Sequence, residues 1–407
     1  MLVAKRPRAA LSIPAIGVIG VIGALSWSGC GTPTTADDQR LIVWINSDKG
    51  YRGLQQIGDR FTEATGVPVV VEHPQDATNK FQQAASSGKG PDIFIWPHDR
   101  LGEWRAGGLV AEIQPSLDTR NALEDKGWDA FTIGGRLWGY PIAFEAVCLL
   151  YNKALLPEPP QRFDQLPAIQ RRLQATGKRA ILWEFAKVYF TYGLLAANGG
   201  YAFARRDNGT YDADDIGVAS PGAVQGLAVI SELVESGLMP RSATYNDAES
   251  AMAAGQLAMM IGGAWSWNNL ARAGVDLGVA PIPAVGDRPA RPFVGVLGAM
   301  INQASRKKDI AAEFIEHYLL QVDGLQLIND DKPIGVPAHK GFYRTLADDP
   351  RIHATMMSVR DGVLMPNNPE MGGFWGAMDT ALENVAQGRQ APQRALETAA
   401  MRMRKSR

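Results

Sequence analysis

Apolar runs alternate with helical repeats along the chain, and this pattern predicts an α/β protein. Residues 41–45 form a short apolar run. Leu54, Ile57 and Phe61 then recur at helical spacing until Gly66, which predicts an amphipathic helix. Continuous apolar strands that alternate with helices are typical of a parallel sheet covered on both faces. We therefore expect such a sheet to open the fold.

The same alternation continues through the rest of the sequence. Short apolar runs predict further strands over residues 69–71, 92–96, 180–183 and 257–261. The Asn-Gly pair at 208–209 is a signal for a hairpin turn.

Helical spacing of apolar residues predicts the intervening helices. Two of them are expected around residues 80–87 and 224–234. Asp247 is expected to cap a third helix, and Ser305 is expected to open a fourth. The tail from Phe374 onward is expected to be helical throughout.

The N-terminal segment predicts an export signal over residues 1–29. Three cations precede an apolar run over residues 9–27, and small residues then lead to Cys30. The alternative is a permanent transmembrane anchor, because the run approaches the length that spans a bilayer. Pro14 and the glycines within the run favour a cleaved signal.

The two cysteines each leave an alternative open. The small residues before Cys30 resemble a bacterial lipobox, whose cysteine is acylated and becomes the new N-terminus, and residues 30–39 would then form a flexible tether. Ordinary cleavage is the alternative, because Trp27 stands where an aliphatic residue is usual. Cys148 lies in an apolar run, so we expect a buried free thiol, with a disulfide to Cys30 as the alternative.

Composition and charge exclude several classes of function. The 407 residues suit two domains of ordinary size. The 41 basic and 42 acidic residues nearly cancel, so we expect no nucleic-acid partner. Removal of residues 1–29 would lower the net charge from −1 to −4, which favours solubility.

Sequence motifs for catalysis, metals and cofactors are absent. The five histidines are scattered, with no metalloprotease motif and no zinc-binding spacing of cysteine and histidine. No nucleophile elbow, phosphate-binding loop or dinucleotide-binding glycine motif follows a strand. The sequence therefore predicts a protein that is not an enzyme and holds neither a metal nor a cofactor.

Polar and aromatic residues gather at the carboxyl ends of two predicted strands. Ligands of open α/β sheets bind outside these strand ends. Charged side chains form strong hydrogen bonds with hydroxyl groups, and flat aromatic rings cover the apolar face of a sugar. The residues expected to converge there are Asn46, Asp48 and Lys49 after the first strand, and Trp96, His98, Asp99 and Arg100 at the third.

The alternative is that these groups serve only the structure. The acids and cations would then pair as surface salt bridges, and the tryptophans would fill the core. Their joint position at strand ends favours a binding crevice.

Several stretches resemble the maltose-binding proteins. Two examples are Gly-Gly-Tyr-Ala-Phe at 199–203 and Pro-Phe-Val-Gly-Val-Leu at 292–297. The resemblance covers essentially everything after residue 40. The other matching stretches are 43–46, 48–51, 90–92, 98–100, 140–143, 151–153, 331–333, 349–352 and 365–367.

The resemblance implies an α/β periplasmic-binding-protein fold, in which two lobes are joined by hinge crossings and a sugar binds between them. Binding would close the lobes like a hinge. The first lobe would comprise residues 40–144 and 299–344, and the second lobe residues 148–293 and 350–407. The hinge crossings would lie near 144–148, 293–299 and 344–350.

The resemblance also implies which residues contact sugar. The polar contacts would be Asp48, Lys49, Asp99, Arg100 and Glu145. The stacking and apolar contacts would be Trp96, Tyr189, Phe190, Trp265, Met365 and Trp375.

The chain departs from the family pattern at positions that bear on specificity. Lys187 stands where the family has an acid, and Asp379 stands where it usually has an arginine, which suggests one compensated pair. Gly376 replaces an aromatic wall, and Thr78 and Asn79 replace two acids. Together with Asn46, the residues Lys187, Gly376 and Asp379 are our specificity candidates.

The implied function is capture of maltose or short maltodextrins and their delivery to the membrane permease of an ABC importer. The protein would be a monomer in the periplasm, with a lipid anchor if Cys30 is acylated. The changed positions leave trehalose or another disaccharide open as the ligand. A sensor that contacts a chemoreceptor is a further alternative.

A glycoside hydrolase is the rival from another class of function. Hydrolysis needs two carboxyl groups flanking one bond, one of them with a raised pKa. Asp48 and Asp99 lie beside Lys49 and Arg100 in the sequence, so we expect both acids to be held ionised. Glu145 is then the one acid of the three that could be protonated.

Overall fold

The computed structural model of the chain describes residues 40–206 and 208–405. The described residues belong to one compact unit. The predicted export signal over 1–29, the lipidation candidate Cys30 and the tether over 30–39 lie outside the described residues. Within the described part, none of the helices combines the length and the apolar character that a membrane crossing requires.

A first, seven-stranded sheet has the order β14-β6-β13-β3-β1-β2, with β15 paired beside β13. We call this sheet and its helices the first lobe. Strand β1 runs parallel to β2 and β3, but β13 is antiparallel to β3 and β6. The strands are β1 (Leu41–Trp44), β2 (Val69–Glu72), β3 (Ile93–Pro97), β6 (Tyr140–Ala146), β13 (Phe293–Ile301), β14 (Val336–Pro337) and β15 (Val363–Leu364).

The three strands that open the fold are parallel, as predicted, but the sheet as a whole is mixed, because β13 is antiparallel to both of its long neighbours. Strand β13 enters the sheet after the chain has built a second sheet, so it runs opposite to β3. The helices of the first lobe pack around this mixed sheet on two buried apolar clusters. They are α1 (Tyr51–Thr65), α2 (Ala77–Ser86), α3 (Leu101–Ala106), α4 (Leu117–Ala122), α5 (Asp125–Ala130), α11 (Lys308–Phe314), α12 (Val322–Asp331) and α13 (Lys340–Leu346), with the short helix η2 (His98–Arg100), the π-helical turn η5 (Ile315–Leu319) and the hairpin β4 (Thr132–Ile133) with β5 (Arg136–Leu137).

A second sheet has the order β12-β7-β11-β8, and we call it and its helices the second lobe. Its strands are β7 (Cys148–Asn152), β8 (Arg179–Leu182), β11 (Leu257–Gly262) and β12 (Leu277–Ala280). Its helices are α6 (Leu166–Gln174), α7 (Val188–Ala197), α8 (Pro221–Glu235), α9 (Tyr245–Ala253), α10 (Trp267–Arg272), α15 (Met371–Ala386) and α16 (Pro392–Lys405), with η3 (Phe163–Gln165) and η4 (Ala264–Ser266).

The strands β9 (Ala204–Arg205) and β10 (Tyr211–Asp212) form a hairpin around the Asn-Gly pair at 208–209. This confirms the predicted turn.

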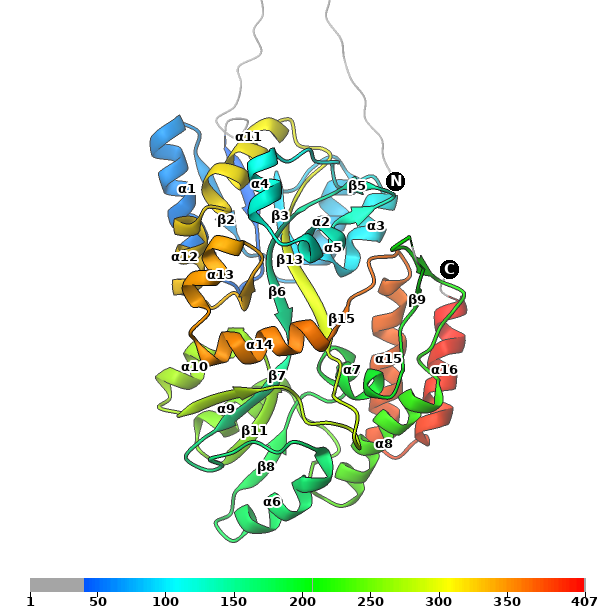
Figure 1. The fold of residues 1–407 in the computed structure, drawn as a ribbon. Helices are drawn as coiled ribbons and strands as arrows, with labels where there is room; N and C mark the ends of the chain where they lie inside the picture. Colours follow the sequence, from blue (N-terminus) through cyan, green and yellow to red (C-terminus); the bar gives the residue numbers. More distant parts are fainter. Residues whose placement is uncertain (1–39, 207, 406–407) are drawn as a thin grey trace, which may run out of the picture. The chain divides into compact units, whose positions relative to one another are not determined.

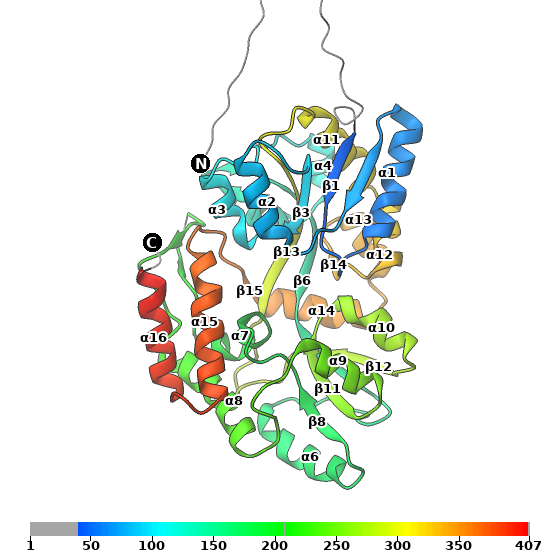
Figure 2. The ribbon, with the colours of Figure 1, turned by 180° about the vertical axis from the view of Figure 1, so that it is seen from behind.

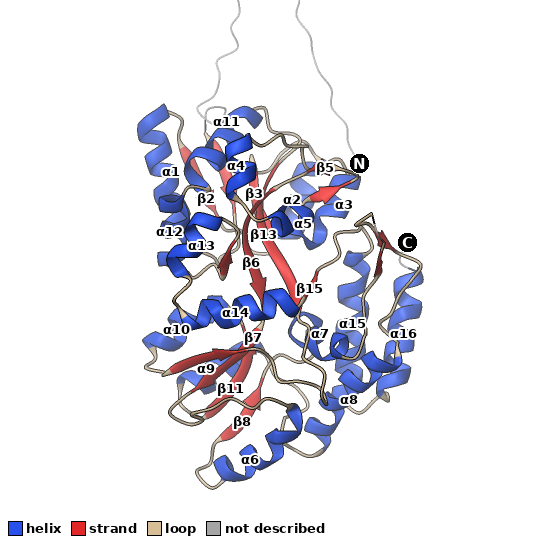
Figure 3. Cartoon of the chain, viewed as in Figure 1, coloured by secondary structure: helices blue, strands red, loops and turns tan. Residues whose placement is uncertain are grey.

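The two sheets are linked where β6 continues into β7 and where β13 returns to the first lobe (Figures 1 and 2). Helix α14 (Pro350–Asp361) lies at this junction, against β12 of the second sheet and β6 of the first. Figure 3 shows the strands of the two sheets as separate groups on either side of α14. The exact residues at which the predicted lobes meet stay a prediction.

Three predicted helix boundaries are wrong. The N-cap of α9 is Thr244 and not Asp247. Asp247 is the third residue of the helix, and its carboxylate accepts from the backbone N–H of Thr244, which completes a capping box. Ser305 does not open α11, because its hydroxyl donates to Asp92 Oδ1 and its oxygen accepts from Lys307 N. The C-terminal tail is not continuous, because Gly388 has a left-handed φ of 72° between α15 and α16.

Cys148 is a buried free cysteine at the start of β7. Its Sγ lies 3.3 Å from the Ser358 hydroxyl of α14. Burial raises the pKa of the Cys148 thiol above its ordinary value. Of the two alternatives that the sequence leaves open, the structure therefore supports the buried free thiol.

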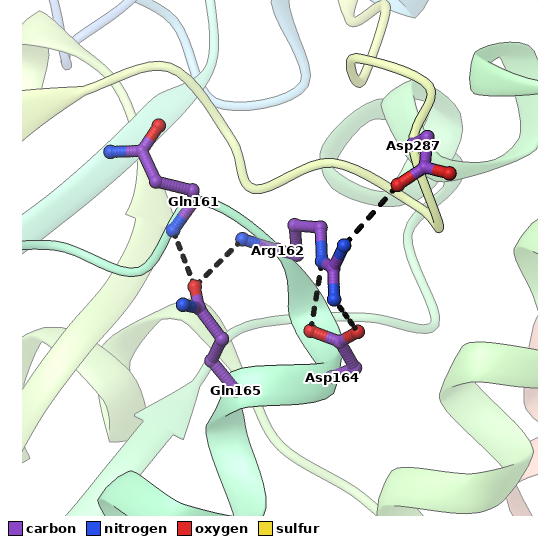
Figure 4. A network of polar contacts seen from close by, with 5 residues as sticks. All are labelled: Gln161, Arg162, Asp164, Gln165 and Asp287. Atoms are coloured by element: carbon purple, nitrogen blue, oxygen red, sulfur yellow. Dashed lines mark hydrogen bonds and ion pairs between the residues drawn. The ribbon is translucent and has the colours of Figure 1, made fainter.

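A polar network fixes the start of α6 on the surface of the second lobe (Figure 4). The side-chain oxygen of Gln165 accepts from the backbone N–H groups of Gln161 and Arg162. The guanidinium of Arg162 pairs with Asp164 at 2.6 Å and with Asp287 at 3.2 Å. These side chains are exposed, so the network orders a loop and contributes little to stability.

Candidate functional site

A cavity of about 570 Å³ lies between the two lobes. The first lobe contributes the loop after β1, the end of β3 and residues of β6 and β13, and the second contributes α7, α9, α10, η4 and α15. Ten of the eleven predicted sugar contacts line it: Asp48, Lys49, Trp96, Asp99, Glu145, Tyr189, Phe190, Trp265, Met365 and Trp375. The candidate Asn46 lines it as well.

An ion pair lies among the residues that line the cavity. Lys49 Nζ contacts Glu145 Oε1 and lies 3.8 Å from Asp48 Oδ2. Burial alone would lower the pKa of Lys49, but Glu145 and Asp48 outweigh burial and raise it. The same ammonium lies 5.2 Å from the ring centroid of Trp265 on the other lobe. Lys49 therefore stays charged and joins the two lobes.

The buried carboxylate oxygen Oδ1 of Asp48 accepts no hydrogen bond within the described part of the chain. An unpaired buried acceptor is costly, so this atom favours a ligand that donates hydrogen bonds. A sugar hydroxyl is such a donor.

Aromatic rings from both lobes face the cavity. Trp96 comes from the first lobe and stacks on Phe94 with an interplanar angle of 14°. Tyr189 and Trp265 come from the second lobe, where their ring centroids lie 6.4 Å apart. Trp375 comes from α15 of the same lobe. The cavity thus presents flat apolar surfaces to a ligand from two sides.

Asp99 and Trp375 meet across the cavity. The Trp375 indole N–H donates to Asp99 Oδ2 at 3.1 Å. Burial raises the pKa of Asp99 to about 6, although Arg100 and the bond from Trp375 act to lower it. Arg100 therefore does not hold the pKa of Asp99 low, as the sequence suggests, because the penalty of burial is larger.

Arg100 and His98 do not reach the cavity, which corrects the predicted convergence. The guanidinium of Arg100 turns to Glu103 at 2.7 Å and to Gln82 at 3.0 Å. His98 is fully buried, accepts from Val296 N and donates to the carbonyl of Met365. Burial lowers the pKa of His98 to about 4, so the ring stays neutral and serves to link β13 to the segment that carries Met365.

The specificity candidates of the second lobe lie outside the cavity lining. Lys187 Nζ pairs with Asp379 Oδ2 at 2.9 Å, so the two charges compensate each other as the sequence predicts. Asp379 Oδ1 also accepts from the backbone N–H of Val188, the first residue of α7. Gly376 is exposed on α15, and a Cβ there would meet open space.

Sequence reasoning missed a polar group of cavity residues. Tyr245, Asn246 and Glu249 come from α9, Asn269 comes from α10, and Lys332 follows α12. None of them lies at the end of a strand, so the strand-end argument does not find them. Asn246 and Glu249 are three residues apart, so they lie on one face of a helix, and this spacing is the only sequence feature that could have pointed to these cavity residues.

Across the described ranges, 40–206 and 208–405, no cluster of three or more histidine, cysteine or acidic side chains is arranged to hold a metal. The cavity groups are hydrogen-bonding side chains and aromatic rings. Their arrangement can bind a neutral, hydroxyl-rich molecule without a cofactor.

Comparison with known proteins agrees with this geometry. The family model of the bacterial extracellular solute-binding protein matches residues 45–321. The galactooligosaccharide-binding protein of Bacillus subtilis is 27% identical over 398 residues, which cover 93% of each chain.

Two further relatives carry related names. The maltotriose-binding protein of Pyrococcus abyssi is 28% identical over 357 residues, covering 85% of this chain and 77% of the relative. The maltooligosaccharide ABC transporter solute-binding lipoprotein of Streptococcus pneumoniae is 25% identical over 396 residues, covering 91% of this chain and 92% of the relative.

Proposed function

The chain belongs to the bacterial extracellular solute-binding protein family, and on that basis we propose that it captures maltose or a short maltodextrin for an ABC importer. The ligand would bind between the lobes, close them like a hinge and be delivered to the membrane permease. A different disaccharide, such as trehalose, is the alternative ligand. Members of this family bind solutes and are not enzymes, which decides against the glycoside hydrolase.

The observation that carries this proposal is the composition of the cavity. Trp96 from one lobe and Trp375 from the other offer flat surfaces, and the unpaired Oδ1 of Asp48 offers a strong acceptor. Apolar faces with a few placed polar groups suit a sugar ring. The names of the three relatives, which bind galactooligosaccharides, maltotriose and maltooligosaccharides, support an oligosaccharide ligand.

The lobe boundaries and the anchor are part of the same proposal. The first lobe would span residues 40–144 and 299–344, and the second residues 148–293 and 350–407. Acylation of Cys30 is supported by the lipoprotein named among the relatives. Mass spectrometry of the processed N-terminus tests it: an unmodified cysteine, or cleavage elsewhere, would contradict acylation.

Substitution of the facing tryptophans tests the proposed function. Trp96→Ala and Trp375→Ala should each weaken maltose or maltotriose binding at least about tenfold, because each removes a stacking surface. Titration followed by intrinsic fluorescence measures the affinity, and thermal unfolding checks that the variants fold. Trp138→Ala is the matched control, because Trp138 is also half-buried but lies outside the cavity lining. Unchanged affinity in both cavity variants would refute the site.

A further inference from the structure

We propose that Gly263 is a positioning residue for the sugar site, because only a glycine at this position leaves room for the ring of Trp265 where it lines the cavity. Gly263 is buried, directly follows β11 and is the N-cap of η4. Trp265 lines the cavity, but Gly263 does not. The expected effect on sugar binding rests on the proposed function, whereas the contact between Gly263 and the ring stands without it.

The backbone conformation at Gly263 does not require a glycine. Its φ of −136° and ψ of −174° are extended values that any residue can adopt. A left-handed backbone, which does favour glycine, occurs elsewhere in the chain, for example at Gly255 with a φ of 68°. The need for a glycine at position 263 therefore comes from the space around its Cα.

That space is filled by the indole of Trp265. A Cβ added at Gly263 would lie 2.1 Å from Cζ3, 2.3 Å from Cη2 and 2.6 Å from Cε3, all in the six-membered ring. Carbon atoms in contact are normally about 3.5 to 4.0 Å apart, so the ring or the backbone would have to move. The backbone continues from β11, which is paired with β7 and β8, and the carbonyl of Gly263 accepts from Ser266 N at 3.2 Å. The ring is therefore the part that turns away.

In its present place, the ring of Trp265 has partners from both lobes. The ring centroids of Tyr189 and Tyr245 each lie 6.4 Å from that of Trp265. Lys49 comes from the first lobe, and its Nζ lies 5.2 Å from the same centroid. A turned ring would lose these contacts and would change the flat surface that a sugar meets. Gly263 thus sets the orientation of a stacking surface without lining the cavity.

Gly278 offers a matched control in the same lobe. It lies in β12, its φ is not positive, and a Cβ there would lie 2.1 Å from Cζ of Tyr151. Neither Gly278 nor Tyr151 lines the cavity. Gly278→Ala therefore makes the same kind of collision with an aromatic ring, but away from the proposed site.

The first measurement follows the ring itself. The full chain is labelled with a fluorinated tryptophan, and the fluorine resonance of Trp265 is identified by its loss in Trp265→Ala. Gly263→Ala should shift this resonance, whereas Gly278→Ala should leave it in place. An unshifted resonance in Gly263→Ala would overturn the inference, whatever the ligand.

The second measurement is a double-mutant cycle on sugar binding. Isothermal titration with maltose and with maltotriose should show that Gly263→Ala weakens binding about tenfold in the wild type. The same change should have no further effect in Trp265→Ala, because the ring that it displaces is then absent. Gly278→Ala should leave the affinity unchanged. Equal losses in the two backgrounds, or no loss in the wild type, would contradict the positioning role.

Thermal unfolding provides a third measurement, which needs no sugar. Gly263→Ala should lower the Tm of the wild type but not that of Trp265→Ala, because removal of the ring makes room for the methyl group. The same fall in Tm in both backgrounds would count against the ring contact. If the wild type binds neither sugar, the proposed function fails, and the fluorine resonance and the Tm values still decide whether Gly263 fixes the ring.

Discussion

At the scale of single residues, Asp99 is the cleft acid whose charge should respond to pH in ordinary buffers. Burial raises its pKa to about 6 from an ordinary value of 3.8. The folded state then holds the proton more tightly than the unfolded state, so the contribution of Asp99 to stability is present at low pH. It is lost as the pH rises through this window.

This predicts a pH-dependent difference between the wild type and Asp99→Asn. The asparagine does not titrate, so the stability of the wild type relative to the variant should fall as the pH rises from about 4 to about 6. Chemical unfolding at several pH values measures the free energy of unfolding of each. Parallel profiles across this window would contradict the raised pKa.

A second residue-scale prediction concerns Lys187 and Asp379. The side chain of Lys187 is largely exposed to solvent. The coupling energy between Lys187 and Asp379 in a double-mutant cycle should therefore be only about 0.5 kcal/mol. Asp379→Ala should nevertheless destabilise the protein by about 1 kcal/mol more than Lys187→Ala, because Asp379 also accepts the first N–H of α7. Equal losses would show that the bond to Val188 contributes nothing.

The sequence predicted many cavity residues because strand ends have a fixed place in an α/β sheet. Asn46, Asp48 and Lys49 follow β1 and line the cavity as expected. Arg100 could not be placed in the same way. It lies one residue beyond Asp99, and the short helix η2 turns it toward Glu103 instead. The rotation of a side chain within one turn is set by packing that the sequence pattern does not reveal.

At the scale of elements, the close packing of α1 on α12 depends on Gly53. A Cβ added there would lie 2.1 Å from the carbonyl oxygen of Leu327, which is backbone and cannot move aside. Gly53→Ala should therefore cost about 1 to 3 kcal/mol.

Gly376→Ala is the contrasting change, because its Cβ would meet open space on α15. It should stabilise the protein by up to about 1 kcal/mol. Thermal and chemical unfolding of both variants measure the effects. A neutral Gly53→Ala would contradict the close helix contact.

A contact across the first lobe explains why the predicted helix start at Ser305 is wrong. Ser305 has the residue type of a helix start, but its hydroxyl is committed to Asp92 across the lobe. Glu249 and Asn269 have no distinguishing pattern, yet they line the cavity because α9 and α10 are carried there by the second sheet. In each case a contact between distant parts of the chain decides the outcome, and local sequence does not encode that contact.

At the scale of the whole molecule, most of the features that the sequence predicts are found in the two sheets and in the cavity between them. The strands follow the apolar runs closely, as in β1, β2 and β3. The antiparallel β13 was missed, because strand direction depends on how the chain returns from the second lobe. The contacts that cross the cavity, such as Trp375 with Asp99, depend on the arrangement of the lobes.

Isothermal titration of the full chain against maltose, maltotriose, trehalose, sucrose and glucose is the direct test of oligosaccharide capture. We expect maltose or maltotriose to bind with one ligand per chain and a dissociation constant of about a micromolar, which corresponds to a binding free energy on the order of −8 kcal/mol. Binding of trehalose or sucrose alone would keep the oligosaccharide-capture role and change the specificity. Absence of binding heat with every sugar would contradict oligosaccharide capture.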